Sequence, residues 1–164
     1  MDNNEILKHI ETNKNKPVKK SSESEKLLKF MIVQVNNKKY AFFAHQIKEI
    51  VTNVSLYFVP FVPPYIRGFI NRHGEPHTVF DLNALFEKET LESSTFLISN
   101  FENDQIAFLV SAVTEILKIP ESKIHMIKSS NENDELFIGS VTSDDDEIFI
   151  INLPNIKVRL ENDL

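Results

Sequence analysis

Short runs of apolar and β-branched residues, separated by polar turns, dominate the chain from residue 27 onward. Such runs predict strands, and pairs of them joined by three or four polar residues predict hairpins. The expected hairpins pair 28–35 with 39–43, 95–101 with 105–110, and 136–142 with 147–151. Further extended segments are expected at 56–61, 69–71 and 78–80. The pattern therefore predicts a mainly β protein, built as barrels or as a sandwich.

The expected helices are few and short. Ile47, Ile50 and Val51 lie at helical spacing, which indicates a turn of helix within residues 44–51. Pro64 is placed to begin another short helix that ends at Gly68. Two further helices are expected where polar residues can cap them, Asp81 before Leu82 and Asn152 before Ile156.

The first 26 residues differ from the rest in composition. They are rich in Asn, Lys, Glu and Ser and contain few large apolar residues. Such a segment buries too little surface to offset the entropy lost on ordering. We therefore expect a disordered tail over 1–26 and a folded domain over 27–164. The alternative for the tail is a short helix with Ile6, Leu7 and Ile10 on one face.

Composition excludes several classes of function. The net charge of −6 argues against nucleic-acid binding, which needs clustered Lys and Arg. The chain has no cysteine, so disulfides, thiol catalysis and thiolate metal sites are excluded. No apolar run approaches the roughly 18 residues of a transmembrane helix. These features predict a cytoplasmic protein without direct membrane insertion.

Catalytic and cofactor-binding motifs are also missing from the sequence. Its three glycines do not form a phosphate-binding loop. His73 and His77 are separated by Gly74 and Pro76 and so cannot share a helical face, which argues against a zinc pair. Asp81 has no second titratable group at a readable spacing, so a capping role is expected. We predict no catalytic residues, no metal site and no cofactor.

An ordered set of motifs resembles the CheW-like coupling proteins of bacterial chemotaxis. The most specific stretch runs from Val59 to Asn71 and reads VPFVPPYIRGFIN. It follows Tyr40-Ala41 and residues 47–51, and it precedes Gly74 and residues 79–82. Later parts of the family pattern match the segments 108–110, 113–117, 138–139 and 148–153. The resemblance extends from about Phe30 to Leu160.

Four positions depart from the family pattern. His73 stands where the family usually has arginine, with Arg72 just before it, and Thr78 replaces a usual proline. Ser111 and Asn152 stand where aspartate is common. The departure at His73 puts the usual receptor contact in question.

The resemblance implies two small five-stranded β-barrel subdomains with a few short helices. It implies a non-catalytic scaffold that links a methyl-accepting chemoreceptor's signalling tip to a CheA-type histidine kinase. Such a scaffold is cytoplasmic and recruited to membrane receptor arrays. The kinase-binding residues are not identified. The residues that the resemblance assigns to the receptor are Ile47, Glu49, Gly68, Asn71, Arg72 and His73.

Several alternatives remain at this stage. The alternatives to a chemotaxis coupling protein are a CheW-like adaptor for a different kinase pathway, in motility or development, and a small enzyme of unrelated type. Gly68 either permits close backbone approach, in the core or to a partner, or ends a helix. Ile47 is either a core residue or a contact residue. Glu49 is either a solvated charge or the ion-pair partner of Arg72.

Overall fold

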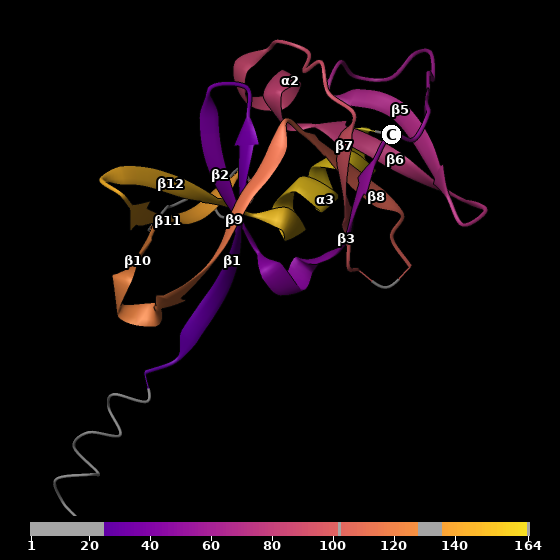
Figure 1. Cartoon of the computed structure of the whole chain (residues 1–164). Coiled ribbons are helices and arrows are strands. Elements are labelled where there is room, and N and C mark those ends of the chain that lie inside the picture. Colours follow the sequence, from indigo (N-terminus) through magenta and orange to yellow (C-terminus); the bar gives the residue numbers. More distant parts are fainter. Residues whose placement is uncertain (1–24, 102, 128–135, 164) are drawn as a thin grey trace, which may run out of the picture.

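A computed structural model of the chain describes residues 25–101, 103–127 and 136–163. Two six-stranded sheets form the body, and Figure 1 shows them side by side. The first sheet has the order β10-β11-β12-β2-β1-β9 and contains β1 (Leu27–Val35), β2 (Lys38–Phe43), β9 (Ala112–Pro120), β10 (Ile124–Met126), β11 (Phe137–Ser143) and β12 (Asp146–Ile151). The second has the order β3-β7-β8-β6-β5-β4 and contains β3 (Ile47–Thr52), β4 (Leu56–Tyr57), β5 (Ile66–Arg72), β6 (Glu75–Asp81), β7 (Thr95–Ser99) and β8 (Ile106–Val110).

Strands β1 and β2 form a wall shared by two apolar cores. Successive side chains of a strand point to opposite faces. Phe30 and Ile32 pack into a core with residues of β9, β11 and β12, inside the first sheet. Met31 and Val33 alternate with them along the strand and pack into the larger core with residues of the second sheet. The strand is buried on both faces, which explains why its apolar run is almost continuous.

Two α-helices and two short 3-10 turns complete the described fold. α2 (Leu82–Glu87) follows β6 directly, and α3 (Leu153–Asp163) follows β12. The turns are η2 (Ala44–Gln46) and η3 (Glu121–Lys123). Although α3 follows a strand of the first sheet, its residues Leu153, Ile156 and Leu160 are buried in the larger core with residues of the second sheet. The helix therefore ties the two sheets together (Figure 1).

The predicted mainly β architecture and its hairpins are confirmed. β1 pairs with β2, β7 with β8, and β11 with β12, all antiparallel. Among the described residues each sheet has six strands, whereas five were expected in each subdomain. The two capped helices are also confirmed, because Asp81 Oδ1 accepts a hydrogen bond from Ala84 N at 3.0 Å and Asn152 Oδ1 accepts one from Asn155 N at 3.3 Å.

Of the two other expected helices, the one from Pro64 to Gly68 is wrong, and the one within residues 44–51 is present only as the 3-10 turn η2 at Ala44–Gln46. Residues 47–52 form strand β3, in which Ile47 and Val51 are buried and Ile50 is 45% exposed. A spacing of four residues returns to the same face in a strand as well as in a helix, so the spacing of Ile47 and Val51 did not distinguish the two. Residues 66–68 belong to strand β5, which is paired with β6 and β4.

The two described residues before the expected boundary at residue 27 are hydrogen-bonded to the folded body. Lys26 O accepts a hydrogen bond from Glu121 N at 3.0 Å, and Glu25 Oε1 accepts one from Ser122 N at 2.7 Å. Both bonds attach the approach to β1 to the turn η3. Residues 1–24, including the alternative helix through Ile6, Leu7 and Ile10, lie outside the described residues.

Candidate functional site

The β5–β6 hairpin ends in a tight exposed turn. His73 has φ 54° and Gly74 has φ 82°, and two successive left-handed residues are typical of a type I′ hairpin turn. Asn71 Oδ1 accepts a hydrogen bond from Gly74 N at 3.0 Å, which fixes the shape of the turn. The side chain of His73 is exposed at the tip. The geometry thus presents an imidazole to solvent, with Asn71 in a supporting role.

An ion pair joins this hairpin to strand β3. Arg72 donates a hydrogen bond to Glu49, and the two side chains are 33% and 31% exposed. In the order of the sheet, β3 and β5 are separated by β7, β8 and β6, so the sheet must curl to bring them together. The hydrogen bond from Arg72 lowers the pKa of Glu49 below its ordinary value. The carboxylate is therefore charged at neutral pH, and the ion pair considered from the sequence is present.

Two of the six predicted receptor residues are part of the internal structure. Ile47 is 9% exposed and packs in the larger core. Gly68 has φ 130°, and a methyl group at its Cα would overlap the carbonyl oxygen of Tyr57 and lie 2.9 Å from its carbonyl carbon. Gly68 therefore permits close approach of β5 to the Tyr57–Phe58 backbone. Of the alternatives considered for it, the helix end is wrong and the close approach within the fold is correct.

Strand β3 also exposes an apolar side chain that the sequence reading assigned to a helix face. Ile50 lies next to Glu49 and is 45% exposed. In a strand, residues that alternate with buried ones face outward. Ile47 and Val51 are both buried, so a strand over this segment places Ile50 on the outer face. Predicting a strand here would therefore have predicted that Ile50 is exposed. Its side chain is exposed on the face of β3 opposite to Glu49.

Asp81, the carboxylate singled out in the sequence, is a fully buried structural group. Its Oδ2 accepts hydrogen bonds from Arg67 Nη1 at 2.9 Å and from Leu91 N at 2.8 Å, in addition to the helix cap on Oδ1. Arg67 also donates to Leu91 O at 2.9 Å. The sequence indicated the cap but not Arg67 or Leu91, because neither contact has a local signature. This arrangement holds the segment after α2 against β5.

Within the parts of the chain that the structure describes, no group of three or more His, Cys, Asp or Glu side chains is arranged to hold a metal ion. None of the described helices is long and apolar enough to cross a membrane.

Comparison with known proteins identifies the family. The sequence profile of the CheW-like domain matches residues 29–159. The chain is 26% identical over 143 residues to the chemotaxis protein CheW of Helicobacter pylori, covering 84% of this chain and 86% of the relative. It is 30% identical over 113 residues to the chemotaxis protein CheW of Bacillus subtilis, covering 67% of this chain and 70% of the relative.

A solved structure agrees with these relatives. The scaffolding protein CheW of Thermoanaerobacter tengcongensis superposes with a TM-score of 0.69 at 26% identity, over 78% of this chain and 90% of that one. Sequence profile, relatives and fold agree, and they place the chain in the CheW family of chemotaxis coupling proteins.

Proposed function

We propose that the chain links a methyl-accepting chemoreceptor to a CheA-type histidine kinase and that it does so in the cytoplasm, at receptor arrays, without catalysing a reaction. Membership of the CheW family is the observation that supports this role most strongly. The decisive experiment is reconstitution of receptor, kinase and this chain, followed by measurement of kinase autophosphorylation. Loss of receptor control when the chain is omitted is expected. Equal control with and without the chain would argue against coupling.

The receptor contact is proposed to lie on the exposed part of the predicted site. Glu49 and Arg72 are partly exposed and paired, and His73 and Asn71 lie at the hairpin tip. Ile47 and Gly68 contribute by shaping the strands below this surface, because their own atoms face the interior or a neighbouring backbone. This division separates contact residues from supporting residues among the six.

Arg72→Ala is expected to weaken receptor binding about thirtyfold, the loss typical of truncating an interface hot spot. Arginine is always cationic and offers a planar fork of five N–H donors, whereas the imidazole of the neighbouring His73 has only two ring nitrogens. Arg72 is therefore expected to supply the cationic contact that the family usually takes from the next position. Binding is measured by calorimetry or by co-sedimentation with receptor-containing membranes.

Two further variants give this experiment its controls. Lys48→Ala removes a neighbouring exposed cation of β3 and should leave receptor binding nearly unchanged. His73→Arg should fold normally, since its side chain is exposed, and should bind receptor at least as well as the parent. Unchanged receptor binding by Arg72→Ala, with normal folding, would contradict the assignment. Kinase binding should be the same for all three variants.

Nucleotide binding is expected to be absent. The sequence has no phosphate-binding loop, and the best-placed carboxylate, Asp81, is already occupied by three donors. Titration of the protein with ATP and Mg²⁺ in a calorimeter should give only heats of dilution at micromolar protein. Saturable heat in that range would show a nucleotide site and contradict the scaffold role.

A further inference from the structure

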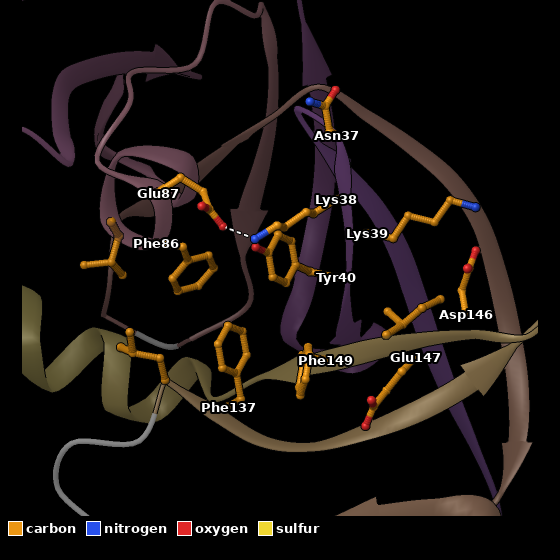
Figure 2. Close-up of a pocket in the computed structure, with 13 residues that line it drawn as sticks. Asn37, Lys38, Lys39, Tyr40, Phe86, Glu87, Phe137, Asp146, Glu147 and Phe149 are labelled. Atoms are coloured by element: carbon orange, nitrogen blue, oxygen red, sulfur yellow. Dashed lines mark hydrogen bonds and ion pairs between the residues drawn. The ribbon is translucent and has the colours of Figure 1, made fainter.

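A pocket of about 580 Å³ lies where the first sheet opens toward α2. The parallel strands β2 and β12 are paired at Tyr40–Phe149 and Ala41–Ile150. Both strands begin earlier, at Lys38 and Asp146, and these first residues diverge on either side of the pocket. Figure 2 shows the pocket between β2, β12 and α2. The pocket is therefore lined by strands β2 and β12 of the first sheet and by α2, which follows strand β6 of the second sheet.

Four aromatic side chains form the floor of this pocket (Figure 2). The ring centroids of Tyr40 and Phe86 are 5.1 Å apart, those of Phe86 and Phe137 are 4.9 Å apart, and those of Phe137 and Phe149 are 5.4 Å apart. Phe149 is 39% exposed. Because these rings pack on one another from four different elements and Phe149 is partly exposed, they offer a preformed apolar surface for a flat ligand.

The rim of the pocket carries charges of both signs. On one side Lys38 pairs with Glu87 of α2. On the other, Glu147 Oε1 accepts a hydrogen bond from Ser140 Oγ at 2.9 Å. Lys39 of β2 and Asp146 of β12 remain, and neither has an ion-pair or hydrogen-bond partner among the described residues. The pocket thus offers one unpaired ammonium, that of Lys39 on β2, and one unpaired carboxylate, that of Asp146 on β12.

We propose that this pocket binds a small zwitterion with a flat apolar body, of the chemistry of a free aromatic amino acid. The apolar body would cover the exposed rings, the ligand carboxylate would pair with Lys39, and the ligand ammonium would pair with Asp146. A ligand with only one charge leaves one of these two groups without a partner, so charge complementarity favours the zwitterion.

The site is separate from the proposed receptor surface. Strand β6 runs from the hairpin tip to Asp81, and α2 with Phe86 and Glu87 follows at the other end. A seven-residue strand spans roughly 20 Å. The ligand and the receptor can therefore bind at the same time, and this inference stands or falls independently of the coupling role.

L-Tryptophan is the probe, because the chain contains no tryptophan and the ligand's fluorescence is observed alone. Three analogues are titrated separately for comparison. Tryptamine lacks the carboxylate, indole-3-propionate lacks the ammonium, and N-acetyl-tryptophan amide imitates a residue within a peptide. We expect saturable binding of L-tryptophan, and binding about fivefold or more weaker for each analogue. Equal affinity for the amide would assign the pocket to a peptide side chain and overturn the proposal, as would absence of L-tryptophan binding.

Two charge-removing variants test the orientation. Asp146→Asn should weaken L-tryptophan to the affinity of indole-3-propionate and leave indole-3-propionate unchanged. Lys39→Gln should weaken L-tryptophan to the affinity of tryptamine and leave tryptamine unchanged. Lys118→Gln and Glu121→Gln, exposed and outside the pocket, are the matched controls and should bind as the parent does. Circular dichroism melts verify folding, and variants that fold and bind L-tryptophan like the parent would overturn the assignment.

Discussion

Gly68→Ala is expected to destabilise the protein by about 3 kcal/mol or more. The residue has φ 130°, a conformation that residues with a Cβ rarely adopt. The added methyl group would overlap the carbonyl oxygen of Tyr57 and would lie 3.2 Å from the Cα of Phe58. Both neighbours are backbone atoms, which cannot move aside as the end of a side chain can. Relief therefore requires that β4 separate from β5, and thermal or urea unfolding measures the cost.

Gly74→Ala is the matched control for this substitution. Gly74 also has a positive φ, 82°, but a Cβ there would have no heavy atom within 4 Å. Only the left-handed conformation is then unfavourable, at about 1–2 kcal/mol. The difference between the two variants isolates the steric part. Equal destabilisation by both would show that Tyr57–Phe58 yields readily and that the close approach at Gly68 is unimportant for stability.

Local pattern was enough to predict the hairpins and the caps. Alternating or continuous apolar runs with polar turns between them have few alternative structures, and Asp81 and Asn152 precede helices as expected. The segment from Ile47 to Val51 was predicted as helix because the helical period of 3.6 residues and the strand period of 2 residues both place these two residues on one face. Its pairing partner is β7, which begins more than forty residues later. Only this long-range pairing, absent from local spacing, selects the strand.

The site was only partly predictable for the same reason. Family resemblance pointed to Ile47, Glu49 and Gly68, but not to which atoms reach the surface. That depends on the bulge between Ile66 and Gly68 and on the curl that brings β3 to β5. The aromatic pocket had no sequence signature, because Tyr40 and Phe137 are nearly a hundred residues apart. Contacts of this kind follow from the topology and not from any one segment.

Asp81→Ala is expected to lower the free energy of unfolding by about 3–5 kcal/mol, the cost of breaking a buried ion pair. The carboxylate is completely buried, and its removal leaves Arg67, which is 21% exposed, and two backbone N–H groups without their acceptor. Each unsatisfied buried donor adds to the cost. For a chain of this size the melting temperature should fall by roughly 10 °C or more. A fall of less than about 3 °C would contradict the structural role assigned to Asp81.

The double variant Arg67→Ala/Asp81→Ala separates the ion pair from the other bonds of Asp81. Once the carboxylate is gone, removing Arg67 also removes an unpaired charge, so the double variant should be less destabilised than the sum of the single variants. Glu87→Gln serves as the exposed comparison, because water solvates both members of the Lys38–Glu87 pair. It should leave the melting temperature nearly unchanged. Strict additivity of the two core substitutions would mean that Asp81 stabilises the fold through the Ala84 and Leu91 amides, with Arg67 contributing independently.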